Sequence, residues 1–148
     1  MTPEAIKELV RRDIEDVWVK GNVSAVEQVS GQERKARDPI EGTEVGRGPE
    51  QLKSVVSHYR DMFSDLQIEI ESLIVDGDMA AARLSVRSKA TGEFMGVRVD
   101  HKPVSITAHN FYRVRDGKIV ESWSEWDRLG LMRQLGVFPM QQERSVGE

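Results

Sequence analysis

Carboxylates and indole rings lie close together in the segment ESWSEWDRLG, Glu121 to Gly130, near the end of the chain. An apolar wall disfavours the charged form of a carboxyl group and so raises its pKa. An acid tuned in this way can exchange protons with a carbonyl or an enol group near neutral pH. Glu125 and Asp127, the acids on either side of Trp126, are therefore candidate general acid–base residues.

Asp38 is the third candidate acid, because it stands before Pro39 in a long polar segment that could bring it to the same site. Each of the three acids also has a structural alternative. Asp127 precedes a helix-like segment and could be its N-cap. Glu125 could be a solvated residue at the end of a strand, and Asp38 could begin a turn.

The composition is that of a globular protein built as one domain. The chain has 148 residues, of which 39% are hydrophobic and 31% charged, and this mixture is typical of soluble proteins. We expect a single domain over residues 1–148, with an ordered core at about 3–136 and a C-terminal tail at 137–148. The net charge of −4 argues against nucleic-acid binding. No apolar run approaches the roughly 20 residues that cross a bilayer.

Cysteine is absent, and the three histidines show no metal-ligand spacing. The absence of cysteine excludes thiolate nucleophiles, disulfides and cysteine-ligated zinc, and it fits a reducing compartment. The N-terminus has no basic segment followed by an apolar one, so the sequence does not indicate secretion. We therefore expect a cytoplasmic protein without a metal.

Hydrophobic periodicity predicts helices first and strands afterwards. The expected elements are helices at about 3–20 and 23–29, a polar, glycine-rich connection over 31–50, a helix that begins at Pro49 and runs to about 63, strands at about 66–71, 80–86, 104–115 and 118–126, and a short helix at about 128–134. This order is typical of an α+β domain in which N-terminal helices cover one face of a curved antiparallel sheet. The hollow left on the concave face is the natural ligand site.

The dipeptide Asp116-Gly117 predicts a two-residue hairpin, which sets the register of the last two strands. Without a bulge, the cross-strand pairs are Val114 with Ile119, Asn110 with Trp123, Ala108 with Glu125 and Ile106 with Asp127. A bulge in the last strand would turn Ser124 and Trp126 inward in place of Glu125 and Asp127, because side chains alternate along a strand.

The unbulged register assigns roles to the side chains around the hollow. Asn110 and Tyr112 share its mostly apolar face and could orient a substrate, and Trp123 could form an apolar wall. His109 points away from the hollow in this register. It could lie at a subunit interface, but we keep it as a further candidate for substrate binding or for the catalytic base.

The run DGKIVESWSEWDRLGLMRQLG, residues 116–136, resembles the C-terminal signature of SnoaL-like proteins, the polyketide cyclase group within the nuclear transport factor 2-like fold. The resemblance extends through GRGPEQLKSVVSHYRDMFSDLQIEIESLIVDGDMAAARL and TGEFMGV to DIEDVWVKGNVSAVEQV, and so covers nearly the whole chain. The pattern Trp-x-x-x-Asp followed by QLG is fairly specific for the group. The resemblance implies a cone-shaped α+β domain (also called cystatin-like), usually a homo-oligomer, without cofactor or metal.

The aldol cyclases of this group are similar to general acid–base enzymes, in which an Asp on the last strand moves protons and the pocket supplies Gln, His and Asn. Carried over from the hairpin without gaps, the Asp position falls on Ser124, the His on Asn110 and the Gln on Ala108. The Asn that precedes a Pro falls on Asp38. The sequence therefore keeps the scaffold and departs from the group at the cyclase residues.

The expected function is cofactor-independent acid–base chemistry, of the cyclase, lyase or isomerase type, on a hydrophobic polyketide-like carbonyl compound. Asp127 or Glu125 would be the acid–base group, with Asp38 opposite. The alternatives are a non-catalytic protein that binds a hydrophobic ligand, a cofactorless hydroxylase or dehydratase, and a protein whose apolar sheet face serves mainly assembly. The expected partners are a small hydrophobic molecule and further copies of the chain, as a dimer or tetramer, but not nucleic acid or membrane.

Overall fold

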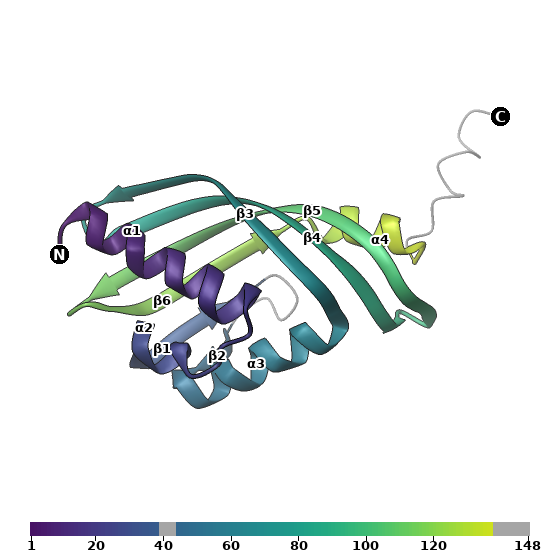
Figure 1. Cartoon of the computed structure of the whole chain (residues 1–148), viewed down its shortest axis with the longest axis horizontal. Helices are drawn as coiled ribbons and strands as arrows, with labels where there is room; N and C mark the ends of the chain where they lie inside the picture. The colour runs from purple at the N-terminus through teal and green to yellow at the C-terminus, as the bar shows by residue number, and fades with distance from the viewer. Residues whose placement is uncertain (39–43, 138–148) are drawn as a thin grey trace.

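The protein contains a curved six-stranded sheet, and its N-terminal helices pack against this sheet (Figure 1). The computed structural model describes residues 1–38 and 44–137. Along the sheet the strands follow the order β2-β1-β6-β5-β4-β3. Their bounds are β1 Ser30–Arg37, β2 Glu44–Arg47, β3 Phe63–Asp76, β4 Met79–Phe94, β5 Val97–Arg115 and β6 Lys118–Trp126. All neighbours are antiparallel except β1 and β6, which run parallel.

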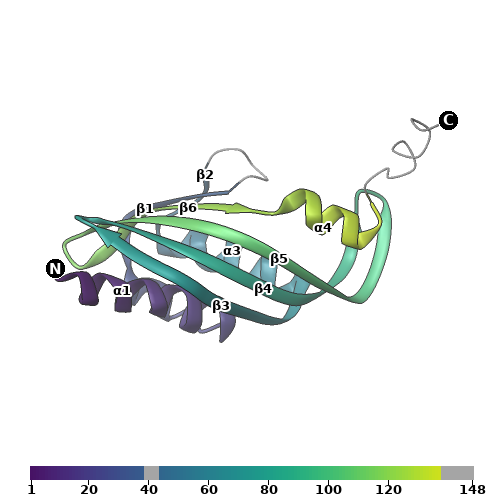
Figure 2. The ribbon, with the colours of Figure 1, turned by 90° about the horizontal axis from the view of Figure 1, so that it is seen from above.

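The N-terminal helices pack on one face of this sheet, as predicted (Figures 1 and 2). They are α1 (Pro3–Arg12), the π-helix η1 (Asp13–Val19), α2 (Ala25–Val29) and α3 (Gly48–Met62), and α4 (Arg128–Leu135) follows the last strand. The hydroxyl of Thr2 accepts a hydrogen bond from the backbone N–H of Ala5 at 3.1 Å and so caps α1. The predicted α+β class is confirmed. No helix in the described part of the chain is long and apolar enough to span a membrane.

Two predicted loops are strands instead. The polar connection expected at 31–50 contains most of β1 and all of β2, on either side of residues 39–43, which are outside the described residues. Its sequence hides the strand because polar residues such as Gln32 and Glu33 are exposed, whereas Ser30 and Arg34 are polar but buried. β5 begins at Val97 rather than at 104. The predicted tail at 137–148 lies outside the described residues except for Val137.

The register predicted for β5 and β6 is wrong beyond the hairpin. Val114 pairs with Ile119 as expected, but Arg113 pairs with Glu121, so one extra residue, Val120, is inserted into β6. Beyond it the pairs are Tyr112 with Ser122, Asn110 with Ser124, and Ala108 with Trp126. The bulge that the sequence left open is therefore present, and it exchanges the two faces of β6 because side chains alternate.

An ion pair between Asp13 and Arg34 joins the helices to the sheet below them. Both residues are almost fully buried, at 3% and 4% exposure. Asp13 Oδ1 accepts from Arg34 Nη1 at 2.7 Å and Asp13 Oδ2 accepts from Nη2 at 3.1 Å. The guanidinium also donates to the hydroxyls of Ser30 and Ser122. One side chain of β1 thus connects η1 with β6.

Replacing Asp13 by Asn should lower the free energy of unfolding by about 3–5 kcal/mol, because Arg34 would keep a buried charge without its counter-ion. Urea denaturation measures this change. Asp16→Asn is the matched control on the same helix, since Asp16 forms only partly exposed ion pairs with Arg12 and Lys20, and it should change stability by less than about 1 kcal/mol. Equal small effects of both substitutions would contradict the importance of the buried pair.

Candidate functional site

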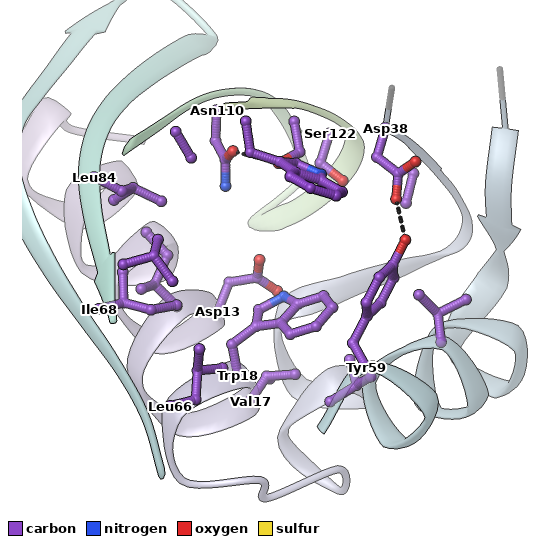
Figure 3. Close-up of a pocket in the computed structure, with 18 of the residues that line it drawn as sticks. Asp13, Val17, Trp18, Asp38, Tyr59, Leu66, Ile68, Leu84, Asn110 and Ser122 are labelled. Atoms are coloured by element: carbon purple, nitrogen blue, oxygen red, sulfur yellow. Dashed lines mark hydrogen bonds between the residues drawn. The ribbon is translucent and has the colours of Figure 1, made fainter. Parts of the chain in front are cut away.

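A cavity of about 200 Å³ lies between the helices and the concave face of the sheet. Its lining is mostly apolar and comes from η1, α3 and the strands of the sheet. Figure 3 shows Trp18 and Val17 on one side, with Leu66, Ile68 and Leu84 from the neighbouring strands closing another. A hollow with this lining favours a ligand with a large apolar surface.

A chain of neutral hydrogen bonds crosses the wall formed by β5 and β6. The hydroxyl of Ser124 donates to Asn110 Oδ1 at 2.7 Å, and Asn110 Nδ2 donates to the hydroxyl of Tyr112 at 2.9 Å. All three side chains line the cavity. The two bonds hold the amide of Asn110 in one orientation, and its nitrogen points into the cavity (Figure 3).

Tyr112 is only 1% exposed. Burial raises the pKa of its phenol above the ordinary value of 10, and the negative charge of Asp13 raises it further, against the opposing effects of Asn110 and Arg34. The hydroxyl is therefore neutral under physiological conditions. It can accept a hydrogen bond from Asn110 but does not act as a phenolate base.

All five N–H donors of the buried Arg34 guanidinium are used in hydrogen bonds within the protein. Burial on its own lowers the pKa of Arg34, but the charge and the hydrogen bonds of Asp13 outweigh this effect, so the pKa is raised. A guanidinium has five N–H donors, and Arg34 makes five hydrogen bonds to Asp13, Ser30 and Ser122. This residue thus stabilises the fold and has no remaining donor for an anionic ligand.

The carboxylate of Asp38 lies at another side of the cavity, just beyond the end of β1. The hydroxyl of Tyr59, on α3, donates to Asp38 Oδ2 at 2.8 Å (Figure 3). Both side chains line the cavity and are half-buried. Asp38 therefore places a carboxylate on the wall of a mostly apolar cavity.

The neighbouring Arg37 anchors this end of β1. Its guanidinium donates to Glu121 Oε2 at 2.9 Å and lies 5.7 Å from the ring centre of Trp123. Burial raises the pKa of Glu121, but the hydrogen bonds from Arg37 and Arg113 outweigh it and hold the pKa below its ordinary value. The ion pairs thereby fix the strand directly before Asp38.

The structure brings four of the predicted site residues to the cavity and leaves three outside it. Asp38, Asn110 and Tyr112 line the cavity, and Trp123 also borders it, although the bulge puts Trp123 on the same face of β6 as Glu121 and Glu125, beside Arg37. Glu125, Asp127 and His109 do not; Glu125 and His109 are register partners, and both are exposed on the other face of the sheet. The prediction that Glu125 and Asp127 face the cavity is wrong because of the bulge at Val120. The inward positions of β6 hold Ser122, Ser124 and Trp126 instead.

Asp127 has the structural role that was its alternative. Its Oδ1 accepts a hydrogen bond from the backbone N–H of Gly130 at 2.8 Å, and its own carbonyl accepts from Leu131 at 3.0 Å. The side chain is exposed and caps α4. Its carboxylate is therefore engaged at the N-terminus of this helix and not in the cavity.

Sequence reasoning missed several residues of the site. Tyr59 was indistinguishable from the apolar stripe of α3, and Trp126 was expected on the outer face. The burial of Asp13 could have been predicted from its spacing in the sequence. It follows Val10 by three residues and precedes Val17 by four, so helical spacing puts it on the buried face, and a buried carboxylate requires a buried donor.

Comparison with known proteins agrees with this architecture. The model of a family described as SnoaL-like polyketide cyclase matches residues 8–135. The chain belongs to this family. A comparison with curated proteins finds no match.

Solved structures of similar fold cover almost the whole SnoaL-like chain. AclR from Streptomyces galilaeus, described as a candidate hydroxylase, is 26% identical with a TM-score of 0.77, over 93% of this chain and 89% of AclR. IdmH from Streptomyces antibioticus, described as a candidate polyketide cyclase, is 26% identical with a TM-score of 0.76, over 89% and 99%. TsrD from Streptomyces laurentii shares the fold at 23% identity and a TM-score of 0.80, over 93% and 99%.

The carboxylate of Asp38 in this SnoaL-like site follows the strand next to Ser124, and Ser124 is the position at which the resemblance places the Asp of the aldol cyclases. Arg37 is the register partner of Trp123 in the parallel pair of β1 and β6. Asp38 and Ser124 each follow one member of this pair, and both line the cavity. Neighbouring strands are about 4.8 Å apart. Continued by one residue, this register puts Asp38 beside Ser124, the cyclase position. Asp38 does not stand opposite Asp127 or Glu125 across the cavity, as had been expected, because neither of these acids lines it.

Replacing Asp127 by Ala should lower the free energy of unfolding by about 1 kcal/mol, because α4 loses its N-cap. Asp127→Asn is the matched control; it keeps an oxygen acceptor and should stay within a few tenths of a kcal/mol of the wild type. Urea denaturation measures both. A stable Asp127→Asn protein that has lost turnover would instead support the catalytic role first predicted for this residue.

Alkaline pH should destabilise the wild-type protein through Tyr112. Its pKa is raised in the folded state, so its contribution is fully present below about pH 10, the pKa of an unfolded tyrosine. Above that pH the unfolded chain releases the proton first, and the free energy of unfolding falls as the pH rises. Tyr112→Phe should lack this fall.

The measurement is urea unfolding at a series of alkaline pH values, with phenolate absorbance recorded in parallel. The chain has two tyrosines, so the variant retains only Tyr59. Phenolate formation by Tyr112 while the protein is still folded would contradict the raised pKa.

Proposed function

We propose that this SnoaL-like protein is an enzyme that carries out cofactor-independent proton transfer on a hydrophobic, polyketide-like carbonyl compound. The observation that carries the proposal is the carboxylate of Asp38 on the wall of an apolar cavity that also contains the oriented amide of Asn110. A base and a hydrogen-bond donor in one hollow are the two groups that enolisation needs.

The apolar lining supports the substrate class. Trp18 and Trp126 offer large ring surfaces, and Leu66, Ile68 and Leu84 extend the apolar part of the lining. Burying apolar surface stabilises a complex by roughly 25 cal/mol per Å². A fused-ring or other aromatic ketone would gain most from such contacts, whereas a small polar metabolite would gain little.

Asp38 acts as the base in the proposed reaction. Its carboxylate removes a proton from the carbon next to the substrate carbonyl, and the electron pair of the broken C–H bond forms the enolate. An amide nitrogen has two N–H groups, and Asn110 uses one for Tyr112. The second can donate to the carbonyl oxygen, where the negative charge develops.

The enolate then reacts in one of two ways. It can take the proton back from Asp38 at another atom, which isomerises the substrate. Alternatively, its carbon can attack a second carbonyl of the same molecule, and the proton then passes to the new alkoxide oxygen as the ring closes. Both routes return Asp38 to its carboxylate form and need no further reactant.

A non-catalytic protein that binds a hydrophobic ligand is the second candidate function. It is favoured by the positions that the resemblance assigns to cyclase residues, because Ala108, Asn110 and Ser124 contain no group that titrates near neutral pH. Such a protein would retain its ligand unchanged, so a measurement of proton exchange separates the two functions.

The proposal is tested with 2-tetralone, a bicyclic aromatic ketone, in deuterium oxide. Wild-type protein should accelerate exchange of the C–H protons between the ring and the carbonyl, followed by NMR. Asp38→Asn should lower the rate by about 10²–10⁴-fold, because the base is removed. Asp61→Asn, an exposed acid on α3, and Glu125→Gln should leave the rate unchanged. Binding of 2-tetralone without accelerated exchange would contradict the proposed enzymatic function and support a non-catalytic binding protein.

A further inference from the structure

We propose that Tyr59 is a positioning residue, whose hydroxyl holds the carboxylate of Asp38 in the orientation needed for proton transfer. This inference rests on the proposed function, in which Asp38 is the base. The primary observation is the 2.8 Å hydrogen bond from the Tyr59 hydroxyl to Asp38 Oδ2 (Figure 3). Tyr59 belongs to α3, whereas Asp38 follows β1, so the bond joins two separate elements at the cavity wall.

The ring of Tyr59 is itself held in place by an aromatic neighbour. Its centroid lies 6.0 Å from that of Trp18, with an angle of 54° between the ring planes. Trp18 belongs to η1, and both rings line the cavity. Tilted aromatic pairs at this separation are attractive. The phenol therefore reaches Asp38 from a ring that also packs on Trp18.

Arg60, the next residue of α3, forms hydrogen bonds to the backbone at Trp18, one member of this aromatic pair. Its Nη1 donates to the backbone carbonyl of Trp18 at 2.5 Å and to that of Val19 at 2.8 Å. Arg60 thus binds the backbone of the residue whose ring packs on Tyr59. These contacts join the end of η1 to α3 at two points.

Gly21 leaves the space in which the Arg60 side chain lies. A Cβ on Gly21 would be 2.6 Å from Arg60 Nε, and the backbone φ of Gly21 is +72°. Both facts favour glycine at this position. The local backbone, the arginine and the aromatic pair form one connected support that ends at the hydroxyl of Tyr59.

This support distinguishes positioning from a purely structural role. Trp18 and Arg60 already hold α3 against η1 without the hydroxyl, so deleting that single oxygen removes the contact with Asp38 and leaves the ring packing. A hydrogen bond to a charged group is stronger than one between neutral groups. Its loss should disturb the orientation of the carboxylate more than the stability of the fold.

A double-mutant cycle tests the inference with wild type, Tyr59→Phe, Asp38→Asn and the double variant. The readout is the rate of deuterium exchange into 2-tetralone. Tyr59→Phe should lower kcat about 10-fold or more with little change in KM, because the ring that lines the cavity is retained. In the Asp38→Asn background the same substitution should have no further effect, since the group it positions is gone.

Two controls accompany the cycle. Ser57→Ala removes an exposed hydroxyl from the same helix and should not change the rate. Binding of 2-tetralone is followed by tryptophan fluorescence, because all three tryptophans line the cavity. Tyr59→Phe should bind the ketone as the wild type does and unfold in urea at a similar concentration.

The outcomes separate the inference from the function on which it rests. If the two losses multiply in the double variant, or if Tyr59→Phe raises KM and leaves kcat unchanged, Tyr59 does not act through Asp38 and the inference is overturned while the enzyme remains. If Asp38→Asn has no effect, or wild type does not accelerate exchange, the proposed function itself fails and the role of Tyr59 fails with it.

Discussion

The buried ion pair of Asp13 with Arg34 is the constraint on which the arrangement of this protein depends. Two charges removed from water are costly unless each is paired and hydrogen-bonded. Arg34 meets this condition with five hydrogen bonds, and its acceptors lie on η1, β1 and β6. The pair can form only when the N-terminal helices, the parallel strand β1 and the last strand are correctly placed together.

The position of Asp38 follows from that of Arg34. Asp38 follows Arg34 by four residues and stands just beyond the end of β1, and Arg37 before it is fixed by Glu121 and Trp123 of β6. The buried pair therefore fixes the middle of β1, and the partly buried pair of Arg37 with Glu121 fixes its end. Tyr59 then holds the carboxylate from the helical side, so the proposed base is supported by both layers of the fold.

The sequence predicted the elements with strong periodicity and missed those whose polarity hides their burial. The apolar stripe of the first helix and the Asp116-Gly117 turn were predicted, and the N-cap at Asp127 was the alternative to its predicted catalytic role, because each depends on local spacing. β1 was missed because its buried residues, Ser30 and Arg34, are polar. The burial of Arg34 depends on hydrogen bonds with Asp13 and Ser122, which are distant in the sequence, and hydrophobic periodicity cannot predict such contacts.

The bulge at Val120 shows how one residue decides the chemistry of the site. Without it, the inward face of β6 would present Glu125 and Asp127, whereas with it the cavity receives Ser124 and Trp126. The inward face of β6 thus has no acid at the position where the resemblance to aldol cyclases places one, and Asp38 lies just beyond the end of the neighbouring strand. If Asp38 is the base, as proposed, it approaches a ligand from a direction that differs by one strand spacing. A substrate that lies in this cavity would therefore expose a different C–H bond to the carboxylate, so the product could differ from that of an aldol cyclase while the chemistry stayed the same.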